Sequence, residues 1–299
     1  MRAARYDQKS GIEGLCVSEV PEPVAAPGHV VVRVMSTCIN PGSLLALSPG
    51  AAFKPHRDLA GEVVAVGEGV QGFAVGDAVL GWSDDTAHAQ LAAVPVAQLV
   101  FKPAQLSWDV AGSLFVSAMA GLACVKAVEP KAGELVVVSG ASGSVGLVAG
   151  QLARRSGAKV IGLARPANAV SLEAHGIIPV AYGDGQEGRI RAAAGGAPIS
   201  AFIDAAGSGS VELALALGVS PSRINTVVDF KAAQEKGVKT MGTRQAGSLP
   251  ALSELARLAA SGELDIPIAA TFPLERLQDA YRRVADRSTH GKVVLRPQE

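Results

Sequence analysis

Short apolar runs separated by turn residues dominate the first hundred residues. Residues 30–34 and 62–66 are rich in β-branched side chains, and Pro27, Gly28 and residues 67–69 separate them from their neighbours. Strands are favoured by such runs, and Gly and Pro mark the turns between them. We therefore expect an all-β region over residues 1–104.

The middle of the chain has a different periodicity. Residues 108–128 are Ala-rich and predict a helix, which residues 130–133 end. After it, helical patterns at 144–156 and 210–217 alternate with strand patterns. The expected strands cover residues 134–139, 159–163, 177–180, 200–205, 223–228 and 238–241. This alternation predicts a parallel, doubly wound sheet.

The last stretch again differs. Residues 249–261 form an amphipathic pattern with Leu252, Leu255 and Leu258 on one face, residues 273–281 start another helix, and residues 291–295 form a strand. The predicted fold class is therefore α/β, with a Rossmann domain inserted in a β-rich domain that both termini build. The expected bounds are 1–104 with 246–299 for the β-rich domain and 105–245 for the Rossmann domain.

A glycine-rich turn joins the first strand of the inserted domain to its helix. Ala141, Gly143 and Gly146 fill the three glycine positions of a dinucleotide fingerprint. Small residues allow a tight turn and close backbone approach to a pyrophosphate, and the helix N-terminus adds unpaired N–H groups and a positive dipole end. The expected cofactor-binding residues in this turn are Ser142, Gly143, Ser144, Val145 and Gly146.

The residue at the end of the second strand of the inserted domain, expected at 159–163, distinguishes NAD sites from NADP sites. NAD-binding sites place an acid near the end of this strand to bind the ribose 2′-hydroxyl. The chain has no acid between Gly146 and Glu173, and Arg165 occupies the expected position. A guanidinium suits a 2′-phosphate and has no acceptor for a hydroxyl pair. The sequence therefore predicts NADPH, the alternative being that Arg165 is a solvated residue at a strand end.

Composition excludes several classes of protein. The chain has 299 residues, is 48% hydrophobic and 18% charged, and carries 27 basic and 27 acidic side chains. A sizeable core is possible, and the zero net charge gives no bulk attraction to nucleic acid or to an anionic membrane. The chain lacks a long apolar run and a signal-peptide core, so we expect a cytoplasmic protein. Cys16, Cys38 and Cys124 are scattered, which indicates reduced thiols.

The order of these pieces resembles the zinc-free branch of the medium-chain dehydrogenase/reductase superfamily, the quinone oxidoreductase and zeta-crystallin type. The matching motifs are PGHVVVRV at 27–34, INP at 39–41, DLAGEVVAVGEGV at 58–70, FAVGDAV at 73–79, VSGASGSVG at 138–146 and HGKVVL at 290–295. The resemblance implies a GroES-like catalytic domain and a homodimer joined through the nucleotide domains. It also implies NADPH-linked reduction of quinones or α,β-unsaturated carbonyls.

The metal ligands of zinc-dependent relatives are replaced in this chain. Asn40 stands at the position of their cysteine and Arg57 at that of their histidine, and a guanidinium does not bind Zn²⁺. His56 lies one residue away and would point elsewhere on an extended segment. Residues 81–88 hold no cysteine where those relatives carry a structural zinc lobe. We expect no metal.

Candidate catalytic residues follow from the resemblance. Asn40 matches an asparagine near the nicotinamide and ribose, and the alternative is an Asn-Pro turn cap. Ser43 stands where many relatives carry an aspartate. Residues 44–50 lack the tyrosine that relatives often use, and residues 119–121 read Met-Ala-Gly in place of Thr-Ala-Tyr. These departures predict a roomy, apolar pocket for a bulky substrate.

Three further residues are candidates for the cofactor or substrate site. Tyr182 aligns with a residue that can flank the adenosine phosphate, and is otherwise a core residue. Val228 is counted among the cofactor-binding residues, and His88 lies in a region that borders the cleft in relatives. The remaining histidines in ordinary turn or capping positions are His29, His175 and His290.

Without zinc, alcohol oxidation loses the Lewis acid that lowers the hydroxyl pKa. Hydride addition to an electron-poor acceptor stays feasible, because it needs mainly orientation and hydrogen-bond donors for the developing oxyanion. We therefore expect an NADPH-dependent reductase of quinones or activated double bonds. The alternative is an NADPH-binding protein without redox turnover, either structural or a non-redox cyclase or isomerase. The sequence does not specify the substrate or the proton donor.

Overall fold

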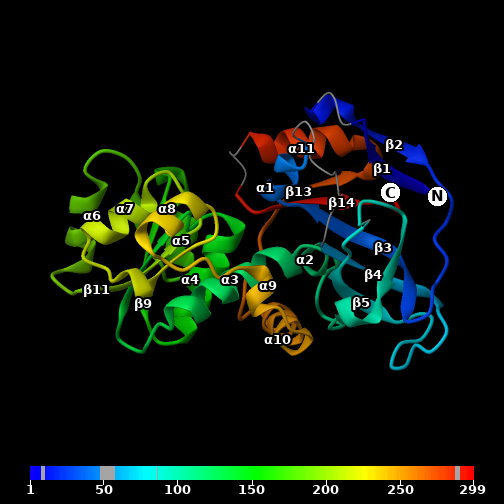
Figure 1. Cartoon of the computed structure of the whole chain (residues 1–299), viewed down its shortest axis with the longest axis horizontal. Coiled ribbons are helices and arrows are strands. Elements are labelled where there is room, and N and C mark those ends of the chain that lie inside the picture. Colours follow the sequence, from blue (N-terminus) through cyan, green and yellow to red (C-terminus); the bar gives the residue numbers. More distant parts are fainter. Residues whose placement is uncertain (8–10, 48–57, 86, 287–289) are drawn as a thin grey trace. The chain divides into compact units, whose positions relative to one another are not determined.

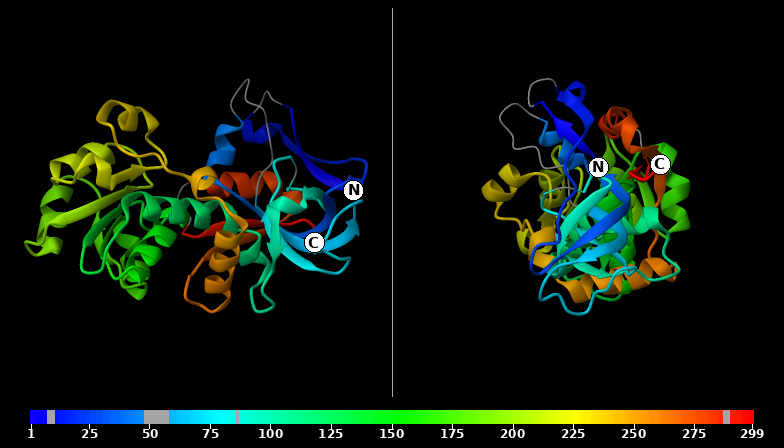
Figure 2. Two further views of the ribbon diagram at one scale, coloured as in Figure 1. Left: turned by 60° about the horizontal axis from the view of Figure 1, so that its bottom comes forward. Right: turned by 90° about the vertical axis from the view of Figure 1, so that its right-hand side faces the viewer.

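The computed structural model describes residues 1–7, 11–47, 58–85, 87–286 and 290–299. The chain divides into two compact units. Met1–Val116 and Ser248–Glu299 form the first, which we call the terminal unit, and Ser117–Gly247 form the second, the central unit. Both chain ends belong to the terminal unit (Figure 2).

The terminal unit is built around a seven-stranded sheet with the order β13-β14-β3-β4-β5-β7, and β6 also pairs with β3. β1 and β2 form a separate antiparallel pair. The strands are β1 (Arg2–Tyr6), β2 (Leu15–Glu19), β3 (His29–Ile39), β4 (Asp58–Val66), β5 (Ala78–Trp82), β6 (Leu91–Pro95), β7 (Leu99–Phe101), β13 (Ile268–Pro273) and β14 (Lys292–Arg296). β3 is the organising strand, because its ladders join β4, β6 and the C-terminal β14.

Helices of the terminal unit lie at the strand connections. They are η1 (Gly11–Gly14), α1 (Pro41–Leu45), η2 (Val96–Gln98), α2 (Trp108–Ala111), α10 (Leu249–Ala260), η5 (Leu274–Arg276) and α11 (Leu277–Ala285). The single helix expected over residues 108–128 is instead two, α2 and α3 (Leu114–Val128). The break falls at Gly112, where an added β-carbon would lie 2.5 Å from the Ser36 carbonyl oxygen of β3. The chain therefore turns where it passes closest to the sheet.

The central unit is a parallel sheet with the order β10-β9-β8-β11-β12, enclosed by helices (Figure 1). Its strands are β8 (Leu135–Ser139), β9 (Lys159–Ala164), β10 (Ile178–Ala181), β11 (Ile199–Asp204) and β12 (Ile224–Thr226). Besides α3, its helices are α4 (Ser144–Arg155), η3 (Pro166–Asn168), α5 (Ala169–Ala174), α6 (Gln186–Ala194), α7 (Ser210–Ala216), η4 (Pro221–Arg223), α8 (Phe230–Lys236) and α9 (Thr243–Ala246). All of β8 is buried, as expected of a parallel strand covered on both faces.

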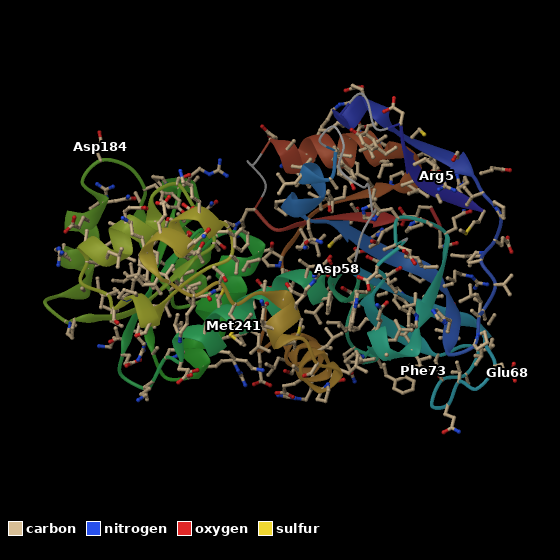
Figure 3. All side chains as sticks on the ribbon, in the orientation of Figure 1. Arg5, Asp58, Glu68, Phe73, Asp184 and Met241 are labelled. Atoms are coloured by element: carbon tan, nitrogen blue, oxygen red, sulfur yellow. The ribbon has the colours of Figure 1, made fainter. Side chains whose placement is uncertain are left out.

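The sixth strand expected at residues 238–241 is reduced to one bridge between Asn225 and Lys239. The Asn225 side chain explains this difference. Its Oδ1 accepts from the Met241 amide at 2.7 Å and its Nδ2 donates to the Met241 carbonyl at 3.1 Å. A side chain thus replaces the ladder at this edge (Figure 3 labels Met241). Among the described residues, no helix is long and apolar enough to cross a membrane.

Candidate cofactor and catalytic sites

The turn after β8, which we call the glycine loop (residues 140–146), is closely packed against itself. Gly140 has φ +68°, and its carbonyl accepts from the Gly143 amide at 2.8 Å. A β-carbon on Gly146 would lie 2.2 Å from that same carbonyl oxygen. Larger residues are therefore excluded at Gly146, and helix α4 begins directly against the turn.

The N-terminus of α4 is suited to an anion. Gly143 is its N-cap residue and makes no side-chain cap hydrogen bond, so the first amides of this twelve-residue helix are not capped by a side chain. Unpaired amides and the helix dipole favour a phosphate at this position. Beside them, the Ser142 hydroxyl accepts from Asn168 Nδ2 at 2.8 Å. The predicted residues 142–146 thus form one site whose shape and donors fit a pyrophosphate.

Tyr182 lies at the edge of this loop, within electrostatic range of Arg165. The Tyr182 hydroxyl accepts from the Gly140 amide at 2.5 Å, and the Tyr182 amide donates to the Ala164 carbonyl at 3.3 Å, next to Arg165. Burial raises the pKa of Tyr182, and the positive charge of Arg165 opposes that shift. Tyr182 is still 38% exposed, so it is not the core residue considered as an alternative.

A buried carboxylate, which the sequence patterns did not single out, orders the opposite side of the glycine loop. Asp204 ends β11 and lies beside the ends of β8 and β12, in register with Ser139 and Thr226. Its oxygens accept from both of those hydroxyls at 2.7 Å. They also accept from the amides of Ala206 and Gly207 at 3.0 and 2.8 Å. Asp204 therefore ties three strand ends to the loop that follows β11.

Val228, the remaining cofactor candidate, lies at this end of the sheet. Its amide donates to Thr226 Oγ1 at 3.2 Å, and a β-carbon on Gly207 would lie 3.6 Å from its side chain. The side chain is 46% exposed. Val228 thus presents an apolar surface beside the Asp204-bound loop.

In the terminal unit, Asn40 joins two buried charged groups. Its Nδ2 donates to Asp58 Oδ2 at 2.8 Å, and its Oδ1 accepts from Lys292 Nζ at 2.7 Å. All three side chains are buried. Asn40 does occupy the N-cap position of α1, but its side chain makes no cap hydrogen bond. Asn40 therefore begins the helix through its main chain, where its carbonyl accepts from the Ser43 amide at 2.8 Å, while its side-chain amide makes these two longer-range bonds.

The second oxygen of Asp58 binds a helix N-terminus. Asp58 Oδ1 accepts from the amide of Val116, in the first turn of α3, at 2.8 Å (Figure 3 labels Asp58). A buried carboxylate needs such partners, since desolvation disfavours its charge. Asn40 and the helix end together supply them, and Lys292 binds the other end of the Asn40 amide. Burial also raises the pKa of the adjacent Cys38 thiol to about 12, with the charge of Asp58 adding to the shift.

Thr37 and His88 extend these contacts into what we call the buried polar network (Thr37, Asn40, Asp58, His88 and Lys292). The Thr37 hydroxyl donates to the Asp58 carbonyl at 2.6 Å and lies 3.1 Å from His88 Nδ1. The single hydroxyl proton is used on the carbonyl, so Nδ1 carries the proton of His88. Burial lowers the pKa of His88 to about 3, which keeps the ring neutral. His88 is fully buried, so it belongs to the interior of this unit.

Ser43 and Tyr281 lie at one side of the network. Both side chains are buried, and neither hydroxyl has a hydrogen-bond partner within normal geometry among the described residues. Burial raises the pKa of Tyr281, and Ser43 is close enough to oppose that shift. The rings of Tyr281 and His88 meet edge to face with centroids 6.1 Å apart. Sequence reasoning found no tyrosine near this position, because α11 supplies it from far along the chain.

The zinc positions are only partly visible. His56 and Arg57 lie outside the described residues. Within the described part of the chain, no group of three or more His, Cys, Asp or Glu side chains could hold a metal ion. The absence of zinc therefore stays a prediction, and Asn40, at the position of the cysteine ligand, is bound to Asp58 and Lys292.

A parallel sheet with a dinucleotide-type glycine loop, whose residues lie in the sequence between the two segments of a β-rich unit, is the organisation typical of two-domain dehydrogenases. The family described as alcohol dehydrogenase GroES-like domain matches residues 26–127, and the one described as zinc-binding dehydrogenase matches residues 172–295. The chain belongs to the medium-chain dehydrogenase/reductase family, and it is a nicotinamide-dinucleotide oxidoreductase of that family.

Curated relatives include acryloyl-coenzyme A reductases, quinone oxidoreductases and a zinc-type alcohol dehydrogenase-like protein. An acryloyl-coenzyme A reductase of Metallosphaera sedula is 26% identical over 330 aligned positions, which cover 95% of this chain and 96% of that protein. The quinone oxidoreductase of Homo sapiens is 32% identical, but the alignment covers only 55% of this chain and 53% of that one.

Solved structures agree on the fold. A quinone oxidoreductase from Coxiella burnetii superposes with a TM-score of 0.88 at 23% identity, covering 99% of each chain. The Escherichia coli quinone oxidoreductase complexed with NADPH gives 0.84 at 22% identity, covering 99% of this chain and 100% of that one. At these identities the similarity concerns the fold.

Proposed function

We propose that this protein is a zinc-independent, NADPH-dependent reductase that transfers hydride to a quinone or an α,β-unsaturated carbonyl with a bulky apolar body. The position of Arg165 after β9, within electrostatic range of a Tyr182 hydroxyl that is bound to the Gly140 amide, carries the cofactor assignment. An NAD site would place an acid where Arg165 stands. The full-length similarity to an acryloyl-coenzyme A reductase and the partial similarity to quinone oxidoreductases support the substrate class.

Each part of the cofactor has matching residues. The amides of residues 144–146, in the first turn of α4, suit the pyrophosphate, and the Arg165 guanidinium with the Tyr182 hydroxyl suits a 2′-phosphate dianion. Val228, which is half exposed beside the Asp204-bound loop, is a further candidate for contact with the cofactor, and Asn40 is the candidate in the terminal unit. When bound, a reduced nicotinamide supplies hydride, and the protein holds the acceptor in place and excludes water.

In the terminal unit, Asn40 is better suited than Ser43 to orient an acceptor oxygen. Asp58 and Lys292 bind the two ends of its amide, so its orientation is determined, and one Nδ2 hydrogen remains for a further bond. A fixed donor stabilises a developing oxyanion without reorganisation. Ser43, by contrast, directs its hydroxyl into the interior beside Tyr281. The neutral, enclosed His88 acts in this mechanism as a structural residue.

Equilibrium binding tests the cofactor assignment. We expect the unmodified protein to bind NADPH about tenfold to several hundredfold more tightly than NADH, from charge-assisted bonds to one phosphate. Arg165→Ala removes most of this preference and leaves NADH affinity unchanged. Lys159→Ala is the matched control, because it removes an exposed cation from the opposite end of β9. Equal affinities in the unmodified protein would overturn the assignment.

A substrate panel tests the reaction. Loss of absorbance at 340 nm with NADPH and a series of quinones and enones is the expected result, with larger apolar acceptors favoured. The missing tyrosine at residues 44–50 and the Met-Ala-Gly at 119–121 favour the alternative, a cofactor-binding protein without redox turnover. Tight NADPH binding with no oxidation by any acceptor would establish that alternative.

A further inference from the structure

Arg189, on helix α6, binds the main chain of the loop that carries Tyr182. Its guanidinium donates five hydrogen bonds to four consecutive carbonyls. Nε and Nη2 bond to Ala181 at 3.2 and 2.8 Å, Nη2 also to Tyr182 and Gly183 at 3.1 Å each, and Nη1 to Asp184 at 2.7 Å. Asp184 is labelled in Figure 3, where its side chain points away from the unit. One side chain therefore determines the course of the connection between β10 and α6.

This loop needs an external constraint because its own residues supply little. Gly183 and Gly185 have φ values of +102° and +73°, and no heavy atom lies within 4 Å of a β-carbon added to Gly183. Glycines in such conformations lose more backbone freedom on ordering than other residues do. The Arg189 guanidinium holds the carbonyls of residues 181–184 together. From the same stretch of backbone the Tyr182 side chain extends to Gly140.

We propose that Arg189 is a positioning residue for cofactor discrimination: by holding residues 181–184 it keeps the Tyr182 hydroxyl at the Gly140 amide, beside Arg165, where a 2′-phosphate would bind. The proposal rests on the function proposed above. We assign Arg189 to the loop and not to the phosphate, because each of its three nitrogens already donates to a loop carbonyl. It acts on the site through the loop and Tyr182.

Geometry distinguishes this role from general stabilisation by a surface arginine. Arg191, two positions along the same helix, pairs with Glu187 at 2.8 Å and donates to the Ala216 carbonyl at 2.8 Å. Arg191 carries the same charge as Arg189 and lies on the same helix. Among the described contacts it makes no bond to residues 181–184. Arg191→Gln is therefore the matched control for Arg189→Gln.

The primary measurement is calorimetric titration of each full-length variant with NADPH and with NADH. Arg189→Gln should weaken NADPH binding about tenfold and NADH binding less than about threefold, which lowers the ratio of affinities. Arg189→Lys should fall between, because an ammonium has three donors and no planar fork. Arg191→Gln should match the unmodified protein. A parallel loss for both cofactors would show a merely structural role, and retained discrimination in Arg189→Gln would likewise overturn the proposal.

A double-mutant cycle tests whether Arg189 acts through Tyr182. In a Tyr182→Phe background, Arg189→Gln should weaken NADPH binding by less than about twofold. Full additivity of the two substitutions would exclude the proposed route. Arg165→Ala separates this result from the function proposed above. If Arg165→Ala leaves the preference intact, the NADPH assignment fails. If it removes the preference while Arg189→Gln does not, only the role of Arg189 fails.

Discussion

The glycine loop and the buried polar network differ in whether their hydrogen-bonding groups are left available or are satisfied within the protein. The loop leaves main-chain amides available at a helix N-terminus and keeps side chains out, as at Gly146. The network places charged and polar side chains in the interior and satisfies them with one another, as Asn40 does for Asp58 and Lys292. A site for an anion needs unsatisfied donors, whereas a buried scaffold tolerates very few.

This difference predicts how each region responds to substitution. Changes in the glycine loop should remove binding and leave the unit folded, because the donors there are exposed main-chain groups. Changes in the network should cost stability, since each removed partner leaves a buried group unpaired. The comparison would be wrong if a glycine-loop substitution unfolded the protein, or if a network substitution removed cofactor binding without a loss of stability.

The largest expected effect is on stability, from Asp58→Ala. The substitution removes the acceptor for Asn40 and for the Val116 amide, and leaves the Lys292 ammonium buried without a carboxylate. We expect the free energy of unfolding to fall by about 3–5 kcal/mol, as measured by urea denaturation. The double variant Asp58→Ala with Lys292→Met should recover part of the loss. A loss below about 1 kcal/mol would mean that the network contributes no more to stability than an exposed ion pair does.

The corresponding change in the glycine loop is Gly143→Val. A β-carbon here lies 3.2 Å from the Gly140 carbonyl oxygen, and the branched side chain would occupy the space in front of the first amides of α4. We expect NADPH affinity to fall more than about a hundredfold, or about 2.7 kcal/mol. Gly188→Val is the control, because a β-carbon there meets no heavy atom within 4 Å. Calorimetry that showed retained binding would mean the loop holds something else.

Acid should weaken the network through His88. Its pKa in the folded protein is about 3, below the ordinary value of 6.5, so the unfolded chain takes up a proton first as the pH falls. Stability from the neutral ring is complete above pH 6.5 and is lost toward the folded pKa, by about 1.4 kcal/mol per pH unit. The unfolding free energy between pH 6.5 and pH 5 should therefore drop by about 2 kcal/mol more than in His88→Gln. Identical slopes would show that His88 is accessible to protons in the folded state.

The smallest expected effect concerns thiol reactivity and needs no change in stability. Cys16 is exposed, whereas burial raises the pKa of Cys38 and of Cys124 to about 12. One thiol should react rapidly with a disulfide reagent in the native protein, and three after denaturation. The Cys16→Ser variant should show no rapid reaction. Fast labelling of a second thiol would mean that the core around Cys38 or the core around Cys124 opens easily in the native protein.

The two regions also differ in what a sequence reveals. The glycine loop was predicted because its residues are consecutive and their spacing alone specifies a turn between a strand and a helix. The order of strands and helices in the central unit was predicted for the same reason. The family and the fold class are confirmed by the domain matches and the superposed structures.

The contacts of the network were not predictable from local pattern. Asn40 bonds to Asp58 across 18 positions and to Lys292 across 252 positions. Tyr281 and Asp204 were missed similarly, since their neighbours are brought together only by sheet pairing and by helix packing. The interrupted helix at Gly112 and the missing sixth strand have the same origin, because Ser36 and the Asn225 side chain override a locally plausible pattern.

The late position of Lys292 has a consequence for synthesis of the chain. Residues of β3 and β4 are synthesised before the central unit, but their sheet partner β14 and the Lys292 ammonium are synthesised after it. The central unit is continuous and complete long before them. On the ribosome, the nucleotide domain can therefore fold while the terminal unit still holds an unbalanced carboxylate and an open sheet edge. Addition of β14 removes both defects in one step, so the terminal unit becomes stable only after the central unit has been synthesised.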